Sequence, residues 1–317
     1  MKAAVLMGPN RVRIEQVEIP EPGEGAVRVR LEGCGVCGSD LVPWEGRPGL
    51  QYPFPPGQPG HEGWGEVDAA GPNAPDFKVG ERVAMLSHHA FAEYDVAREN
   101  SLVRLPASMN KQPFPGKALA GAMNIFQQCE IKPAQTVAIV GIGFLGAILT
   151  SLAARAGAFV IAISRRPFAL DIARHFGSGQ LIELEDNRRV IERVKFFTEG
   201  LGCERVVEAV GQQGPLDLAT ELTAERGRLI IAGDHQDGPG QVNVQKWNRR
   251  GIDVVKANKR DPKVYHDGLK AAVDAISRGE LDPAPLYTHI FAMDEISSVF
   301  ASMRERPQTF MKGLITL

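Results

Sequence analysis

The chain has 317 residues, and its 44% of apolar residues can furnish two hydrophobic cores. Its 36 basic and 38 acidic residues nearly cancel, which argues against a large nucleic-acid-binding surface, and no basic run suggests a membrane-binding patch. Four cysteines in a chain of this size fit a reducing compartment, and the N-terminal residues lack the apolar stretch of a signal peptide. We therefore expect a cytoplasmic protein.

The first third of the chain predicts a β-rich domain made of short, alternating segments. The segments cover residues 11–19, 26–33, 64–71, 81–86, 91–97 and 101–105. Between them, residues 43–60 contain too much proline and glycine for regular structure. This stretch is either a solvated loop, a polyproline ligand or a loop on the substrate side of a site.

From about Gln135 the pattern changes to alternating strands and helices, which predicts a parallel sheet covered on both faces. We expect strands over residues 136–141, 159–164, 205–210, 228–233 and 251–258, with helices up to residue 156 and over 167–177 and 215–225. The tail predicts helices over 263–279 and 294–306 and a last strand over 312–317. Residues 137–163 approach membrane-spanning length, but Arg155 and several glycines favour a strand, turn, helix and second strand.

Gly141, Gly143 and Gly146 form a G-x-G-x-x-G motif directly after a predicted strand and at the start of a predicted helix. In that context the glycines allow a tight turn, close approach of the backbone to a pyrophosphate and close helix packing. The motif therefore predicts a dinucleotide site.

The next predicted strand ends at Ser164, followed by Arg165 and Arg166. NAD-binding domains place an acid here to bind the ribose 2′-hydroxyl, whereas a hydroxyl and guanidinium groups suit a 2′-phosphate. This favours NADP(H), the alternative being that both arginines only end the strand at a solvated surface.

Cys34 and Cys37 form a C-x-x-C pair after the predicted strand 26–33. A structural zinc site would need two further soft ligands at comparable spacing, and only the isolated Cys129 and Cys203 remain. A redox pair would be expected at the start of a helix beside a strand. Partners for these cysteines must therefore come from elsewhere in the chain.

Such partners are found in the segment GHEGWGEV, which contains His61 and Glu62. Cys37, Ser39 and Asp40, then this G-H-E, then a G-x-G-x-x-G domain together resemble the zinc-dependent medium-chain dehydrogenase/reductase family, which includes alcohol, sorbitol and threonine dehydrogenases. The likeness spans the whole chain. It implies an α/β protein with a GroES-like, β-rich catalytic domain over residues 1–115 and 259–317, and a Rossmann doubly wound parallel-sheet domain over residues 116–258.

The resemblance assigns Cys37 and His61 to one catalytic zinc ion. Glu62 is the third ligand in sorbitol dehydrogenase-like members, and in other members it is a carboxylate next to the ligands. It implies that Asp40 orients His61 and that Ser39 takes the proton of an alcohol whose pKa the zinc lowers. Hydride would pass between NADP(H), preferred over NAD(H), and a polyol, sugar derivative or secondary alcohol or ketone. The resemblance also implies a homodimer or homotetramer. The cofactor-binding residues it implies are Gly141, Gly143, Phe144, Leu145, Gly146, Ser164, Arg165, Arg166, Val210, Gly211, Ala232 and Gly233.

Three departures from the family pattern affect the function. The four-cysteine lobe of a structural zinc is missing between residues 81 and 94, and Val42 stands where liver-type enzymes end a proton relay with histidine. Lys117 stands in the region of the family's third zinc ligand, and His88 and His89 either compensate or are ordinary loop residues. Two alternatives to the zinc enzyme therefore stay open: a zinc-free reductase that uses Lys117, and a non-catalytic nucleotide-binding protein.

Overall fold

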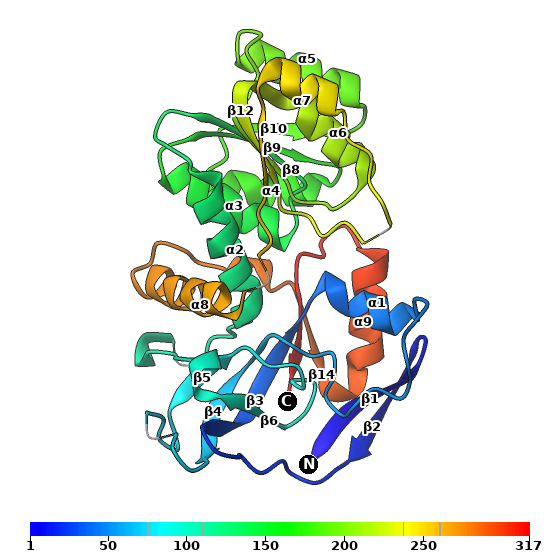
Figure 1. Cartoon of the computed structure of the whole chain (residues 1–317), viewed down its shortest axis with the longest axis vertical. Helices are drawn as coiled ribbons and strands as arrows, with labels where there is room; N and C mark the ends of the chain where they lie inside the picture. Colours follow the sequence, from blue (N-terminus) through cyan, green and yellow to red (C-terminus); the bar gives the residue numbers. More distant parts are fainter. Residues whose placement is uncertain (75, 110, 237, 260) are drawn as a thin grey trace. The chain divides into compact units, whose positions relative to one another are not determined.

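The computed structural model describes residues 1–74, 76–109, 111–236, 238–259 and 261–317. The chain divides into two compact units, of which the first comprises Met1–Gly121 with Asp261–Leu317 and the second comprises Ala122–Arg260 (Figure 1). Within the described ranges, no helix has the length and apolar character needed to cross a membrane.

The first unit is built around strand β3 (Ala26–Val36), which is hydrogen-bonded to β15, β4 and β6. Among the described residues its main sheet has the order β14-β15-β3-β4-β5-β7, and a separate hairpin pairs β1 with β2. Besides β3, the strands of the first unit are β1 (Lys2–Gly8), β2 (Arg11–Gln16), β4 (Gly63–Ala70), β5 (Arg82–Met85), β6 (Tyr94–Arg98), β7 (Leu102–Arg104), β14 (His289–Ala292) and β15 (Gly313–Thr316).

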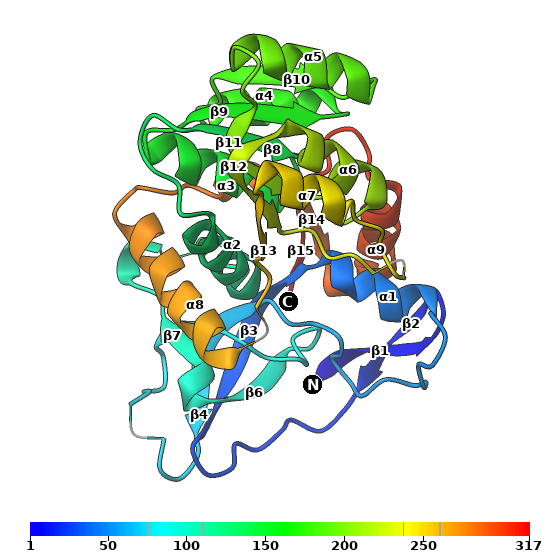
Figure 2. The ribbon, with the colours of Figure 1, turned by 45° about the horizontal axis from the view of Figure 1, so that its top comes forward.

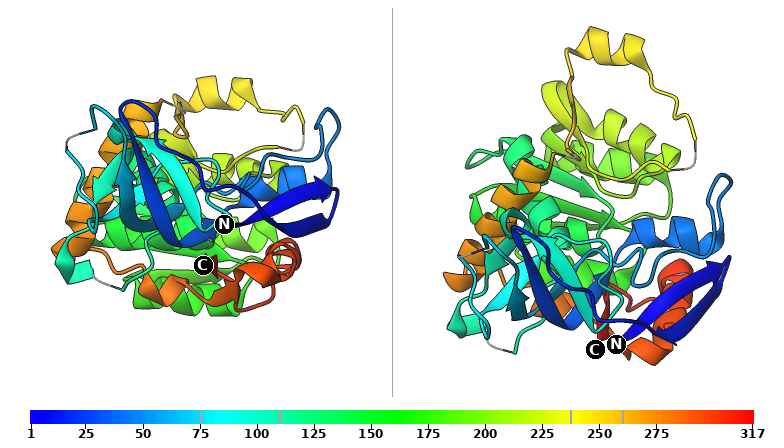
Figure 3. Two further views of the ribbon diagram at one scale, coloured as in Figure 1. Left: turned by 90° about the horizontal axis from the view of Figure 1, so that it is seen from below. Right: turned by 60° about the horizontal axis from the view of Figure 1, so that its bottom comes forward.

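Helices α1 (Leu41–Glu45) and α9 (Ile296–Glu305) lie side by side in the first unit (Figure 1). Trp44 of α1 stacks on Phe300 of α9 with ring centroids 5.6 Å apart, and both are buried in one core with the β3 valines. Helix α8 (Pro262–Ser277) belongs to the same unit, whereas α2 (Gly116–Cys129) crosses the boundary between the units. Both chain ends lie in the first unit, near each other in both views of Figure 3.

The second unit contains the predicted parallel sheet, and every strand pair in it is parallel. Its strands are β8 (Thr136–Val140), β9 (Phe159–Ser164), β10 (Gln180–Glu183), β11 (Cys203–Glu208), β12 (Thr223–Ile231) and β13 (Asp253–Lys256). In the described part of the chain they have the order β10-β9-β8-β11-β12-β13. Counted from β8 this is the order 3-2-1-4-5-6 of a doubly wound dinucleotide-binding sheet, so the prediction is confirmed.

The helices of the second unit alternate with its strands: α3 (Phe144–Arg155), α4 (Pro167–His175), α5 (Asn187–Phe197), α6 (Gln213–Leu222) and α7 (Val244–Arg250). Helix α5 lies beside β10, at the edge of the sheet (Figure 2). The sheet core is made of continuous apolar runs, with Ile161, Ile163 and Val206 fully buried. This is the pattern of strands covered on both faces.

Several elements differ from the sequence prediction. Residues 223–225 were expected to end a helix, but they begin β12, where the β-branched Thr223 pairs with Cys203. The register then shifts before Arg228, and Arg226 between them has a φ of 57°. The structure also contains β10, α5, α7, β1, α1 and β14, which sequence patterns did not predict.

Candidate active site

Cys37 follows β3 directly and precedes one turn of 3-10 helix, Gly38–Asp40. The Asp40 carboxylate accepts the backbone N–H of Cys37 at 2.9 Å and is only 1% exposed. Ser39 lies in the same turn and is half-buried. The turn therefore fixes the backbone of Cys37 and places the buried Asp40 carboxylate beside it.

His61 is tied to the same turn by its ring. Its Nδ1 lies 3.0 Å from Asp40 Oδ1 and 2.9 Å from the carbonyl oxygen of Pro59. Because Nδ1 is engaged in this way, Nε2 is left for another partner. Asp40 therefore holds the backbone of Cys37 with one oxygen and the ring of His61 with the other.

Cys37, His61 and Glu62 form a group whose potential ligand atoms all lie within 4.8 Å of one another. Burial by itself raises the pKa of Cys37, but the hydrogen bond and charge of His61 outweigh it, so the pKa of this thiol is lowered. Burial lowers the pKa of His61, but the Asp40 carboxylate and Cys37 raise it well above its usual value. A cation bound between Cys37 and His61 would therefore displace the proton that links the thiol to the imidazole ring.

Glu62 has a partner that sequence reasoning missed, because Lys312 Nζ lies 2.5 Å from Glu62 Oε2. The side chains of Lys312 and Glu62 are 6% and 1% exposed, so the ion pair is buried. Lys312 immediately precedes β15. Gly35 leaves room for the Glu62 carboxylate, because a Cβ at this position would overlap Glu62 Oε2. In the sequence, the one sign of this role is that Lys312 stands at the start of a mostly apolar final segment, residues 312–317.

The charges of this group fit a divalent cation. Burial of Lys312 lowers its pKa, but Glu62 and Cys37 raise it by more, so Lys312 stays charged. Once a cation has displaced the proton between Cys37 and His61, the formal charges are those of Cys37, Asp40 and Glu62 as anions and Lys312 as a cation, so two negative charges face the metal. Thiolate, imidazole and carboxylate are also the donors that zinc prefers.

Lys117 lies in the first turn of α2, and its Nζ is 5.9 Å from the centre of the Tyr265 ring on α8. It is not the partner of Glu62, because that place is taken by Lys312. Burial lowers the pKa of His88, and the charges of Lys117, His61 and His89 lower it further. The charge of Lys117 thus acts on His88.

His89 has a different position, because it anchors the segment rich in proline and glycine. Its Nδ1 lies 2.9 Å from the carbonyl oxygen of Pro56 and its Nε2 lies 3.1 Å from Gln58 Nε2. The same segment is bonded to β1, since the N–H groups of Phe54 and Gly57 donate to Leu6 and Ala4. Residues 43–45 fall within α1, and residues 54–57 are held against the β1–β2 hairpin.

The glycine motif forms the turn between β8 and α3. Gly141 has a φ of 97°, and a Cβ at Gly146 would overlap the carbonyl oxygen of Gly141. A Cβ at Gly143 would meet nothing within 4 Å, so this turn is open on that side. Phe144 and Leu145 begin α3, whose N-terminal N–H groups face the turn.

Ser164 ends β9 and is 6% exposed, and its hydroxyl accepts the N–H of Arg166 at 3.2 Å. The Arg166 guanidinium donates to the carbonyl oxygen of Ile142 at 3.2 Å, within the glycine motif. Arg165 is exposed. The serine and both arginines are thus gathered at the carboxyl end of β9, beside the turn after β8.

The remaining predicted residues follow the ends of β11 and β12. Val210 and Gly211 come after β11, and Ala232 and Gly233 come after β12. A Cβ at Gly233 would overlap the backbone nitrogen of Gly211, so the two segments touch.

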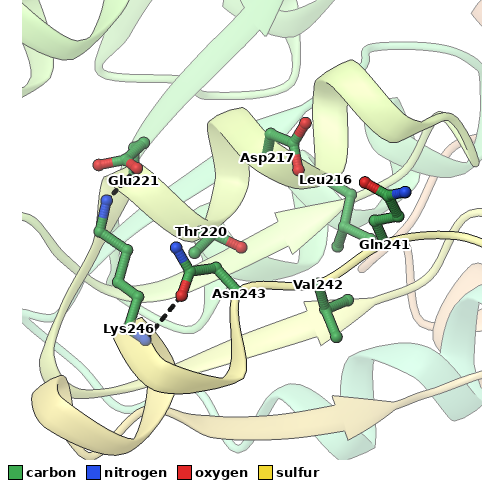
Figure 4. A pocket seen from close by; sticks show the side chains of 8 residues that line it. All are labelled: Leu216, Asp217, Thr220, Glu221, Gln241, Val242, Asn243 and Lys246. Atoms are coloured by element: carbon green, nitrogen blue, oxygen red, sulfur yellow. Dashed lines mark hydrogen bonds and ion pairs between the residues drawn. The ribbon is translucent and has the colours of Figure 1, made fainter.

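A separate pocket of about 180 Å³ lies between α6 and the segment before α7 (Figure 4). Its wall is polar, and the Lys246 ammonium reaches the Glu221 carboxylate across it. None of the residues predicted to bind the nucleotide lines it. The lining residues are Leu216, Asp217, Thr220, Glu221, Gln241, Val242, Asn243 and Lys246.

Comparison with known proteins places both units in described families. Residues 23–107 match the alcohol dehydrogenase GroES-like domain, and residues 145–275 match the zinc-binding dehydrogenase domain. The chain is 24% identical to sorbitol dehydrogenase of Bacillus subtilis, over 93% of this chain and 91% of that protein.

Solved structures agree with the fold. A 2R,3R-butanediol dehydrogenase from Bacillus subtilis superposes with a TM-score of 0.87 at 22% identity, over 100% of this chain and 99% of the other. An Escherichia coli CFT073 short chain alcohol dehydrogenase in complex with NADH gives 0.88 at 23% identity, over 100% and 99%. The predicted GroES-like and Rossmann architecture is thereby confirmed.

Proposed function

The chain belongs to the medium-chain dehydrogenase/reductase family and is an NAD(P)-dependent alcohol dehydrogenase, and we propose that it uses one zinc ion and NADP(H) on a polyol, sugar derivative or secondary alcohol. The observation that carries the zinc proposal is the group of Cys37, His61 and Glu62, which offers a thiol sulfur, an imidazole nitrogen and a carboxylate oxygen within 4.8 Å of one another. Similarity to sorbitol and butanediol dehydrogenases supports the substrate class.

Each residue of this group has a distinct proposed task. Cys37, His61 and Glu62 would hold zinc, which when bound lowers the pKa of a substrate alcohol. Asp40 keeps the His61 ring in one orientation through Nδ1. Ser39, in the turn after Cys37, would accept the hydroxyl proton as the hydride leaves.

In this proposal the catalytic residues lie in the GroES-like domain, residues 1–115 and 259–317. The cofactor binds to the Rossmann domain, residues 116–258. Ser164, Arg165 and Arg166 support NADP(H), because a hydroxyl and two guanidinium groups can bind a 2′-phosphate. The proposal includes association as a homodimer or homotetramer, for which the outer edges of β10 and β13 offer unpaired backbone groups among the described residues. The charge balance and cysteine content support a cytoplasmic location.

One observation favours a second candidate, a zinc-free reductase. Lys312 already neutralises the Glu62 carboxylate, and the charge of Lys117 acts on His88, so the first unit contains positive charge that does not depend on a metal. In that case an ammonium would polarise the substrate carbonyl. A non-catalytic nucleotide-binding protein would have no use for the arranged Cys37, Asp40 and His61.

The proposed function is tested by metal analysis of the purified protein together with a screen of polyols, secondary alcohols and ketones against NADP(H) and NAD(H). We expect about one zinc per chain, loss of turnover after chelation and recovery on adding zinc back. Cys37→Ser should lose both zinc and turnover, whereas Cys34→Ser, at the buried cysteine three residues earlier in β3, should keep both. Two firmly bound zinc ions per chain, or full turnover without any metal, would contradict the proposal.

A further inference from the structure

Glu208, the last residue of β11, is a fully buried carboxylate to which sequence reasoning gave no role. Its Oε1 accepts the N–H groups of Val210 and Gly211, both at 2.7 Å, and its Oε2 lies 3.0 Å from His235 Nε2. Its carbonyl oxygen accepts the N–H groups of Ala232 and Gly233 at 2.9 Å. One residue therefore binds the segment after β11 to the segment after β12.

The contacts around Glu208 extend to the glycine turn after β8. The Val210 side chain packs against Gly141, where an added Cβ would overlap it. Gly211 has a φ of 82°, and a Cβ on it would come within 2.6 Å of the Asp234 carbonyl oxygen. These turns are thus closely packed, and within the described residues the Glu208 carboxylate and the His235 ring link the segment after β11 to the segment after β12 through a side-chain contact.

The sheet order says which half of a dinucleotide these turns face. Strand β8 lies between β9 and β11, so the carboxyl ends of β9 and of β11 with β12 lie on opposite sides of the glycine turn. The pyrophosphate sits at the helix that follows this turn, and the adenosine ribose is bound at the end of the second strand, here β9. The ends of β11 and β12 are left for the nicotinamide half.

We propose that Glu208 and His235 are positioning residues, which hold the backbone of residues 209–211 and 232–234 in the conformation that receives the nicotinamide half of the cofactor. The inference rests on the proposed use of a nicotinamide dinucleotide. Neither side chain takes part in hydride transfer. A buried carboxylate suits this task because charge-assisted bonds to N–H groups are about twice as strong as neutral ones.

The experiment compares binding of the complete reduced cofactor with binding of a fragment that lacks nicotinamide. The fragment is ADP-ribose for NADH and ADP-ribose 2′-phosphate for NADPH. In His235→Asn, the Glu208 carboxylate keeps its bonds to the N–H groups of Val210 and Gly211 and loses its side-chain contact with the second segment. We expect about tenfold weaker binding of the complete cofactor and a lower kcat, with the fragment unchanged within about twofold. His175→Asn on the exposed end of α4 is the matched control and should change neither.

Glu208→Ala removes all three side-chain bonds and should weaken cofactor binding further, whereas Glu208→Gln retains an oxygen for the two N–H groups and should recover most of the loss. If Glu208→Ala does not fold, His235→Asn and Glu208→Gln still test the positioning role. Equal loss for cofactor and fragment, or no loss in His235→Asn, would overturn the positioning role alone. A wild-type protein that binds no nicotinamide dinucleotide would overturn the proposed function as well.

Discussion

Lys312 and Glu62 form a buried ion pair, with 2.5 Å between Nζ and Oε2, next to the two other residues that would hold zinc. Removing one partner of such a pair is strongly destabilising, because the other charge stays buried without compensation. The same lysine competes with a metal for the Glu62 carboxylate. Lys312 therefore stabilises the metal-free protein and weakens one ligand of the proposed zinc.

Lys312→Met should lower the free energy of unfolding of the metal-free protein by about 3–5 kcal/mol. The Glu62→Gln/Lys312→Met double variant should recover much of that loss, because no buried charge remains. Urea unfolding measures both. The control is Lys2→Met, which removes an exposed pair at 4.0 Å to Asp294 and should cost no more than about 1 kcal/mol.

Added zinc should stabilise the Lys312→Met variant, which is destabilised in the absence of metal. Freed from Lys312, Glu62 can turn fully to the metal, so zinc should raise the melting temperature of Lys312→Met more than that of the wild type. An equal rise in both proteins would show that Glu62 does not bind the metal.

The fold was largely predictable because its strongest signals are local. The apolar runs 137–140 and 160–163, separated by a glycine turn and a helix, indicate a parallel sheet whatever the rest of the chain does. Strand β10 and helix α5 were missed because β10 is short and α5 carries five charged residues among eleven. The register shift in β12 depends on pairing with β11, which no local pattern reveals.

The site was predictable where ligands are close in sequence and not where they come from distant strands. Cys37 and Asp40 lie three residues apart in one turn, and His61 with Glu62 follow in a second short motif. Lys312 reaches Glu62 across 250 positions, because β15 pairs with β3. The sequence pointed instead to Lys117, because this lysine lies in the segment that resembles the family's third-ligand region.

The four cysteines should differ sharply in reactivity. Burial raises the pKa of Cys129 and of Cys203 to about 12 and that of Cys34 well above its usual value, so all three remain thiols at pH 8. Cys37 is partly exposed, and its pKa is lowered because His61 outweighs the effect of burial. Since the thiolate is the reactive form, metal-free native protein should show one fast cysteine with iodoacetamide.

Mass spectrometry of the labelled peptides identifies that cysteine. Stoichiometric zinc should protect it, and Cys37→Ser should remove the fast phase while Cys34→Ser leaves it. Fast labelling of Cys129 or Cys203 in the folded protein would contradict the burial described here. Failure of zinc to protect Cys37 would contradict its role as a ligand.

Arg165→Ala should weaken NADPH binding by about tenfold and leave NADH binding nearly unchanged, because only the 2′-phosphate offers a charge-assisted contact. Arg165 is the better choice for this test, since Arg166 also donates to the Ile142 carbonyl oxygen and supports the glycine turn. Fluorescence titration with both cofactors measures the effect. Arg174→Ala, at an exposed arginine on α4, is the control, and tighter binding of NADH than NADPH by the wild type would refute the preference.

Lys117 separates the zinc enzyme from the zinc-free reductase. Its ammonium lies toward the Tyr265 ring, and Glu62 is paired with Lys312, so Lys117 does not draw a ligand away from the metal. For the zinc enzyme, Lys117→Glu should therefore keep or strengthen zinc affinity, because a carboxylate replaces a cation near the site. Lys78→Met, at an exposed lysine of the same unit, is the control for loss of one positive charge and should change neither zinc binding nor turnover. The decisive arm uses exhaustively chelated protein in which no metal is detectable: if it still reduces a ketone and Lys117→Ala abolishes that activity, the ammonium polarises the carbonyl and the zinc mechanism is wrong.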